Sequence, residues 1–113
     1  MNTNKIVFSA DKIDDHLWLG DIDSSRNHDT LDELNITHIL TVLDYDPKHP
    51  ENDRRIRKHI HAYDYESIDL ISEFEACYQF IEQAKHQNGN VLIHCQAGKS
   101  RLFEIFILNS TLF

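Results

Sequence analysis

Apolar residues recur in short runs along the chain, and the spacing within each run predicts the element that it forms. Residues 37–43 are rich in β-branched and aliphatic side chains, which is typical of a buried strand. Residues 59–63 alternate polar and apolar side chains, and residues 91–94 begin as a continuous apolar run, so both are predicted strands. Residues 13–19 contain a further, short strand-like end that breaks at Gly20.

Other stretches carry the period of a helix. The clearest places apolar side chains at spacings of three and four, on one face of a helix. The residues on this face are Phe74, Cys77, Tyr78, Ile81 and Ala84. Ser72 with Glu75 resembles a capping box at its start, and Gly89 is predicted to stop it. A shorter helix is expected over residues 30–35, with Asp29 as its cap.

The order of these elements predicts the fold class. Strand, helix and strand in succession indicate an α/β protein with a parallel core. No repeat, low-complexity tract or linker interrupts residues 1–113, and both prolines fall in a loop predicted over residues 44–50. We therefore expect a single domain with a central, mostly parallel or mixed β-sheet flanked by helices.

The charge balance narrows the range of partners. The chain carries 19 acidic and 11 basic side chains, for a formal net charge of -8. An acidic surface repels nucleic acid and anionic membranes, so neither is expected as a partner. The basic cluster over residues 54–58 is interpreted as a solvated face, with attraction of an acidic or phosphorylated protein segment as the alternative. A pocket for an anion must therefore be built locally.

The number of cysteines indicates the cellular compartment, and the spacing of the histidines indicates whether a metal site is expected. Two cysteines are too few for a disulfide scaffold, and no secretory signal or bilayer-spanning stretch is evident, so we expect a cytoplasmic or nuclear protein. Cys77 is interpreted as a packed side chain on its helix. His59 and His61 are attributed to strand alternation rather than to a metal site, because no second cluster lies at ligand spacing. No metal or cofactor is expected.

The candidate reactive and phosphate-binding residues follow the strand predicted at 91–94. A cysteine at a helix N-terminus, facing oriented backbone N–H groups, has a lowered pKa, so Cys95 is a candidate nucleophile. Arg101 offers a planar fork for two phosphate oxygens, and His94 is placed to orient the loop by hydrogen bonding. The backbone N–H groups between Cys95 and Arg101 are expected to converge on an anion. The residues of this predicted phosphate-binding loop are Gln96, Ala97, Gly98, Lys99, Ser100 and Arg101.

The string from His94 to Arg101 resembles the His-Cys-x-x-Gly-x-x-Arg signature of the protein tyrosine phosphatase superfamily. Residues 17–20 and 36–42 resemble the opening strand and a core strand of its dual-specificity branch, and the likeness covers most of residues 12–101. The resemblance implies a protein tyrosine phosphatase-like fold. It also implies a protein phosphatase that hydrolyses phosphotyrosine or phosphoserine/threonine through a phosphocysteine on Cys95, with a phosphorylated protein as substrate.

A proton donor is needed to expel the substrate oxygen. The resemblance implies that Asp64 has this role. Asp64 follows the strand predicted over 59–63, and its distance from Cys95 along the sequence is about that of the general acid in the family. Asp69 is the alternative acid, although it is also placed to cap the helix that follows.

Two features depart from the family pattern. Leu102 stands where the family usually has a serine or threonine, whose hydroxyl is implied to stabilise the departing thiolate. Residues 102–113 are shorter than the helices with which the family continues, so we expect a C-terminally truncated member. A weak or inactive phosphate-binding module is therefore the alternative function. Another thiolate enzyme, such as a sulfurtransferase or an arsenate reductase, is a third hypothesis.

Overall fold

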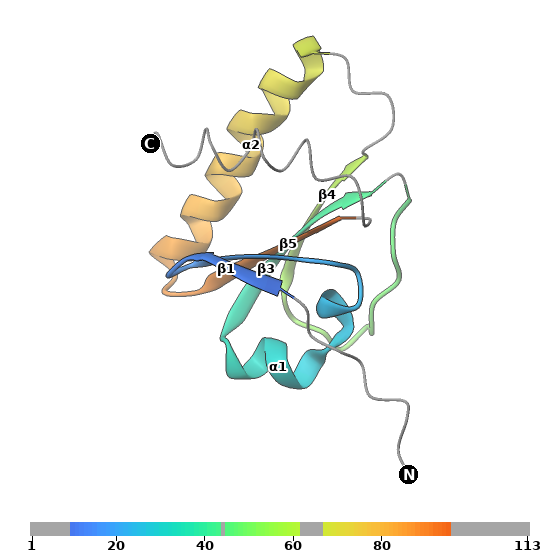
Figure 1. Ribbon diagram of the computed structural model, residues 1–113, viewed down its shortest axis with the longest axis vertical. Coiled ribbons are helices and arrows are strands. Elements are labelled where there is room, and N and C mark those ends of the chain that lie inside the picture. Colours follow the sequence, from blue (N-terminus) through green and yellow to red (C-terminus); the bar gives the residue numbers. More distant parts are fainter. Residues whose placement is uncertain (1–9, 44, 62–66, 96–113) are drawn as a thin grey trace.

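A mixed β-sheet forms the centre of the protein (Figure 1). The computed structural model describes residues 10–43, 45–61 and 67–95, with the side chains of residues 61, 67–74 and 95 excepted. Within these ranges the sheet has five strands in the order β1-β2-β5-β3-β4. The first strand pairs antiparallel with the second, and the other pairs are parallel. The strands are β1 (Ala10–Asp14), β2 (Leu17–Gly20), β3 (Ile36–Leu43), β4 (Ile56–His61) and β5 (Asn90–Cys95).

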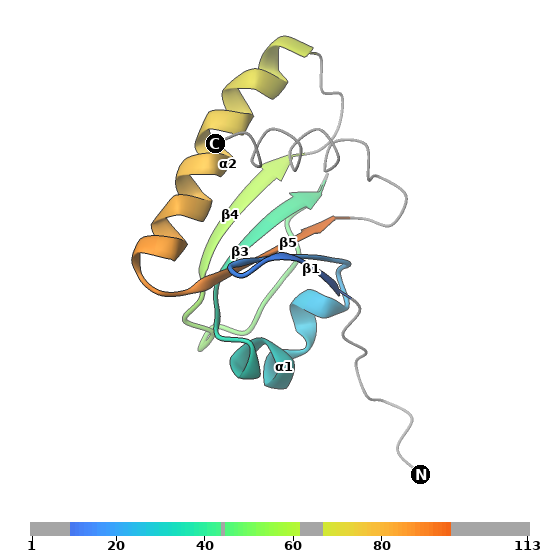
Figure 2. The same cartoon turned by 60° about the vertical axis from the view of Figure 1, so that its left-hand side comes forward.

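Helices cover both faces of the sheet (Figure 2). The long helix α2 (Ser67–His86) packs on one face, and the short helices η1 (Ser24–Arg26) and α1 (His28–Glu33) lie on the other. The α/β class, the single domain and the mixed sheet flanked by helices are thus confirmed. In the described part of the chain, no helix combines the length and apolarity needed to cross a bilayer.

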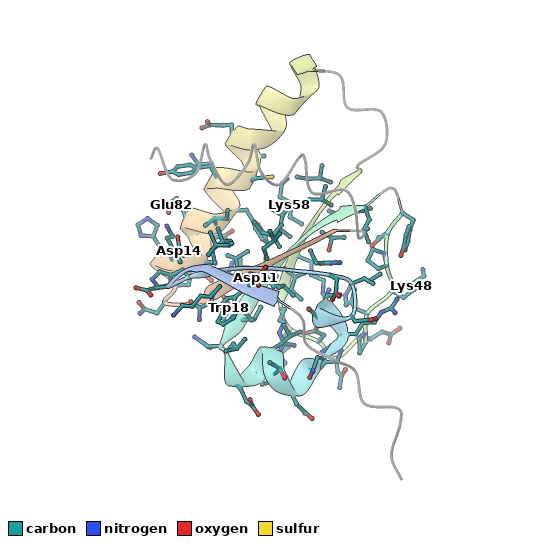
Figure 3. The ribbon with its side chains drawn as sticks, viewed as in Figure 1. Asp11, Asp14, Trp18, Lys48, Lys58 and Glu82 are labelled. Atoms are coloured by element: carbon teal, nitrogen blue, oxygen red, sulfur yellow. The ribbon has the colours of Figure 1, made fainter. Side chains whose placement is uncertain are left out.

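The core has two layers, one on each face of the sheet. The α2 layer joins residues of that helix to β2, β3, β4 and β5, and the α1 layer joins Leu31 to β3 and β5. Trp18 of β2 packs against the α1 layer, on the α1 side in Figure 3. Because β3 and β5 are covered on both faces, their sequences are mostly apolar, and the strands predicted at 37–43 and 91–94 are confirmed.

The strand-like end predicted within residues 13–19 is β2, which forms an antiparallel hairpin with β1. The strand β1 and the turn that joins it to β2 were not predicted. The carboxylate of Asp14 accepts a hydrogen bond from the backbone N–H of His16 at 2.8 Å, which is the local bond by which aspartate favours turns. The adjacent aspartates Asp14 and Asp15 were the available signal.

The start of α1 also differs from its prediction. The helix begins at His28, and its cap is Asn27, whose side-chain oxygen accepts from the backbone N–H of Thr30 at 3.2 Å. Asp29 lies in the first turn instead, where its negative charge faces the positive end of the helix dipole.

Helix α2 begins earlier than the sequence suggested. Its first residue is Ser67, so the capping box predicted at Ser72 and Glu75 lies inside the helix and does not start it. Its end is close to the prediction, but the residue in the left-handed conformation is Asn88, at φ 57°, rather than Gly89. The Gly89 N–H donates to the carbonyl of Ala84 at 2.8 Å, which closes a Schellman-type end.

The apolar face predicted for α2 packs against the sheet. Cys77, Ile81 and Ala84 are buried in the α2 layer, which confirms the interpretation of Cys77 as a packed side chain. Tyr78 is half-buried, and Phe80 joins the core although the spacing did not select it. Phe74 lies in the part of the helix whose side chains are not described.

The basic cluster at residues 54–58 is not a solvated face throughout. Arg55 and Arg57 both pair with Asp53, whose side chain is only 3% exposed. Arg55 also pairs with Asp32 and donates to the carbonyl of Ile36 at 3.0 Å. The basic composition alone suggested a solvated face, whereas at the start of β4 two of these side chains share one carboxylate.

Candidate active site

The carboxyl ends of three parallel strands meet at one edge of the sheet. Cys95 ends β5 and pairs with Val42 of β3, which pairs in turn with Ile60 of β4. Parallel strands lie about 4.8 Å apart, so the Cys95 backbone lies roughly 10 Å from that of Ile60. Asp64 follows His61, the last residue of β4, by three positions. Open α/β sheets bind ligands at this edge, and β4 and β5, the strands that precede the two predicted groups, both end at it.

The central position of β5 explains why this edge can hold a reactive residue. β5 lies between β2 and β3, and its residues Val91, Leu92 and Ile93 are essentially inaccessible to solvent. A strand packed on both faces is held rigidly, which limits the movement of the residue that ends it. The backbone of Cys95 is thus anchored by pairing with Val42.

His94 is the one predicted site residue whose side chain is described. It is 0% exposed, and its Nε2 lies 2.7 Å from the Thr41 hydroxyl. Its Nδ1 is buried and has no hydrogen-bond partner among the described residues. Burial, reinforced by the positive charges of Arg57 and Arg26, lowers the pKa of His94 to about 4. The ring is therefore neutral at pH 7, with one nitrogen protonated.

The cover over His94 comes from the segment after β2. Gly20 is the Cα partner of His94, and a Cβ at Gly20 would lie 3.0 Å from the side chain of Ser24 in η1. The Asp21 carboxylate accepts hydrogen bonds from the backbone N–H and the hydroxyl of Ser24, at 2.9 and 3.0 Å. A glycine at position 20 therefore allows η1 to pack close to this end of the sheet.

The remaining predicted site residues lie outside the described residues. These are the acid Asp64 and the phosphate-binding loop Gln96, Ala97, Gly98, Lys99, Ser100 and Arg101, together with Leu102. Their roles stay predictions. Asp69, the alternative acid, is the third residue of α2 and so belongs to the helix rather than to the loop before it.

Among the described residues, the other candidate sites are less suited to bind a phosphate group than the carboxyl ends of the parallel strands. The described residues include no group of three or more His, Cys, Asp and Glu that could hold a metal ion. His59 and His61 both lie in β4, which confirms their attribution to a strand. A cleft of about 720 Å³ lies at the opposite edge of the sheet, but the guanidinium of Arg55 in its wall is already paired with two carboxylates.

A second, smaller cavity lies on the α2 side of the sheet. It has a volume of about 70 Å³ and is lined by residues of β1, β2 and α2, among them Asp14 and Glu82 (Figure 3). Two acidic side chains in its wall make it unsuitable for a phosphate group.

The sequence reasoning missed Thr41. It was interpreted only as part of a buried strand, although a hydroxyl in an otherwise apolar run is a signal in itself. The pairing register brings it opposite His94, from which it is separated by 53 residues along the chain.

A mixed sheet covered on both faces, with a cysteine ending its central strand, is the α/β architecture of protein tyrosine phosphatase-like proteins, to which this fold belongs. A family model described as "Dual specificity phosphatase, catalytic domain" matches residues 17–107. The chain belongs to this dual specificity phosphatase family.

Individual relatives agree with this assignment. The chain is 40% identical over 96 residues to "Dual specificity protein phosphatase 1" of Arabidopsis thaliana, covering 84% of this chain and 48% of that protein. It is 37% identical over 91 residues to "Dual specificity protein phosphatase 19" of Mus musculus, covering 80% of this chain and 41% of that protein. The chain therefore spans about half the length, or less, of these relatives.

A solved structure supports the fold. The chain superposes on the crystal structure of DUSP15 with a TM-score of 0.74. The match covers 92% of this chain and 67% of the DUSP15 chain. The sequence identity in that comparison is 20%, so it bears on the fold alone.

Proposed function

We propose that the chain is a cysteine-dependent protein phosphatase with Cys95 as its nucleophile. The observation that carries the proposal is the position of Cys95 at the carboxyl end of the central strand, directly after the buried, neutral His94. Membership of the dual specificity phosphatase family supports it.

The proposed reaction has two steps. In the first, the Cys95 thiolate attacks phosphorus, the S–P bond forms, and the P–O bond to the substrate breaks as Asp64 donates a proton to the leaving oxygen. In the second, Asp64 takes a proton from water, which attacks the phosphocysteine and releases inorganic phosphate and the thiolate. Arg101 and the loop N–H groups stabilise the charge on the transferring phosphoryl group in both steps.

The substrate class follows from the family and from the charge of the chain. A phosphorylated protein fits better than a polyanionic nucleic acid, because the net charge is -8. Two cysteines without a disulfide framework suit a reducing compartment, so the proposed location is the cytoplasm or nucleus. Phosphotyrosine and phosphoserine/threonine peptides assayed side by side would show which side chain is preferred.

The test compares hydrolysis of a small aryl phosphate by the parent protein and by Cys95→Ser. We expect Cys95→Ser to abolish turnover, because a serine hydroxyl is not ionised at neutral pH. Cys77→Ala is the matched control, since Cys77 is buried under α2, and it should retain activity. Equal turnover by Cys95→Ser and the parent would refute the proposal.

Leu102 favours a second candidate function, a phosphate-binding module with little turnover. An apolar side chain at this position supplies no hydroxyl to stabilise the thiolate as it leaves phosphorus, so hydrolysis of the phosphocysteine, the second step, is slowed. A thermal melt with and without vanadate separates the two functions. A melt that vanadate raises, in a protein that releases no phosphate, would indicate binding without catalysis.

A further inference from the structure

Thr41 and His94 form a buried hydrogen bond across the centre of the sheet. They are Cα partners on β3 and β5, and the Thr41 Oγ1 lies 2.7 Å from the His94 Nε2. Thr41 is 4% exposed and His94 is 0% exposed. A hydrogen bond of this length between two buried groups on rigid neighbouring strands fixes the orientation of the imidazole ring.

The hydrogen-bonding capacity of the pair selects one tautomer. Among the described residues the Thr41 hydroxyl has no acceptor other than the His94 Nε2. If Nε2 carried the proton, the buried hydroxyl would accept that bond and leave its own O–H unsatisfied, which is costly. If Thr41 donates to Nε2, its O–H is satisfied and the proton of the neutral ring lies on Nδ1. The second arrangement leaves fewer buried groups unpaired.

Burial, and after it the charges around the ring, keep His94 neutral. Arg57 of β4 and Arg26 of η1 oppose its protonation, and His59, the other Cα partner of Thr41, acts in the same direction. Asp21 favours protonation but is outweighed by burial and by these groups. A neutral ring with Nε2 occupied by Thr41 retains a single N–H donor, at Nδ1.

We infer that Thr41 is a positioning residue, which holds His94 in the Nδ1–H tautomer and leaves that N–H as a fixed donor at the end of β5, one residue before the proposed nucleophile Cys95. The inference rests on the proposed role of Cys95, the next residue in the chain. Neighbouring residues of a strand point to opposite faces, so this N–H acts on Cys95 through the backbone between them, and a donor fixed there favours the thiolate over the thiol. Without the Thr41 hydroxyl, the ring is free to exchange tautomers and to rotate, and the thiolate loses part of its stabilisation.

The first test is a long-range ¹H–¹⁵N spectrum of the full chain with ¹⁵N-labelled histidine at pH 7. The parent protein should show His94 as one tautomer, protonated at Nδ1. Thr41→Val, which keeps the shape of the side chain and removes the hydroxyl, should show averaged or altered ring nitrogen shifts. Thr41→Ser should restore the parent spectrum, because serine keeps the hydroxyl.

Thr37→Val is the matched control. The Thr37 hydroxyl lies 2.7 Å from the Nδ1 of a different buried histidine, His38, whose ring packs against Phe80 in the α2 layer. Removing this hydroxyl should alter the signals of His38 and leave those of His94 unchanged. A role for Thr41 that is merely structural would not distinguish the two variants in this way.

The second test measures the pH dependence of Cys95 alkylation by iodoacetamide, in a Cys77→Ala background. Thr41→Val should raise the midpoint by about one pH unit, which corresponds to a tenfold weaker preference for the thiolate. Thr41→Ser and Thr37→Val should keep the parent midpoint. The acidic limb of kcat/KM for an aryl phosphate should move with the alkylation midpoint.

The outcomes separate this inference from the proposed function. If the parent hydrolyses no phosphate but the spectra and alkylation midpoints change as described, the proposed function fails and the positioning role of Thr41 stands. If Thr41→Val leaves the His94 shifts and the Cys95 midpoint unchanged, the inference is overturned whatever the activity. If Thr41→Val does not fold, the spectrum of the parent protein tests the inference by itself. A parent His94 that exchanges between tautomers would overturn the inference.

Discussion

The backbone of Gly89 lies directly against the side chain of Thr37, where the turn after α2 meets the first residues of β3. A Cβ built on Gly89 would lie 2.0 Å from the Thr37 Oγ1 and 2.9 Å from its Cβ and Cγ2. Position 89 is also buried, so there is no open space into which a side chain can move. The close approach, rather than an unusual backbone angle, is the reason for a glycine at this position.

Gly89→Ala should therefore destabilise the protein. Overpacking at a buried site of this kind costs about 1–3 kcal/mol, and chemical denaturation of the parent and variant would measure it. The double variant Gly89→Ala/Thr37→Ala should recover part of the loss, because it removes the Oγ1 and Cγ2 contacts but not the contact with Cβ. Equal stability of parent and Gly89→Ala would contradict the geometry.

Asp53→Ala should be more damaging than the loss of a surface charge. Although burial raises the pKa of Asp53, its hydrogen bonds with Arg55 and Arg57 hold that pKa below the ordinary value. Removing the carboxylate leaves two largely buried guanidinium groups without their shared partner, so we expect a loss on the order of 3 kcal/mol in the free energy of unfolding. Asp15→Ala, which breaks the exposed pair with Lys12, is the control.

That control should leave the free energy of unfolding measurably unchanged, because an exposed pair is screened by solvent. A similar loss in both variants would show that the burial of Asp53 carries no energetic consequence.

The low pKa of His94 predicts that stability falls with acid. An unfolded histidine binds a proton near pH 6.5, whereas folded His94 does so only at about pH 4. Between these values the unfolded state binds more protons, so the free energy of unfolding decreases as the pH falls, by on the order of 3 kcal/mol across the window. Buried His38, whose pKa is also lowered by burial, adds to the same trend.

Urea denaturation at a series of pH values between 7 and 4 would measure this slope. His94→Gln, which has no titrating side chain, should flatten it, whereas His86→Gln at an exposed position should leave it unchanged. Identical slopes in the parent and His94→Gln would show that His94 is not the responsible group.

Asp64→Ala and Asp69→Ala should differ in their effect on catalysis. If Asp64 is the general acid, its removal should lower kcat by about 10²–10⁴-fold for a substrate with a poor leaving group. The effect should be smaller for an activated aryl phosphate, whose leaving oxygen needs less protonation. Asp69→Ala should keep most of the activity, because Asp69 lies in the first turn of α2. The reverse pattern, measured by steady-state kinetics, would assign the acid to Asp69.

The central strands and the site motif were predictable because their signals are local. A strand covered on both faces is mostly apolar, and β3 and β5 are recognisable from that property. The loop from His94 to Arg101 combines residue types that phosphate chemistry requires at fixed spacing. The boundaries of α1 and α2 were less predictable, because several capping residues lie close together near each start.

The sequence by itself therefore determined the α/β class, the order of the main elements and the identity of the proposed nucleophile. Only the tertiary structure decided that Asp53 joins Arg55 to Arg57, and that Thr41 lies against His94. The physical reason is register. Which side chains face one another across a sheet depends on how strands more than fifty residues apart align, and a shift of one residue would turn Thr41 to the opposite face.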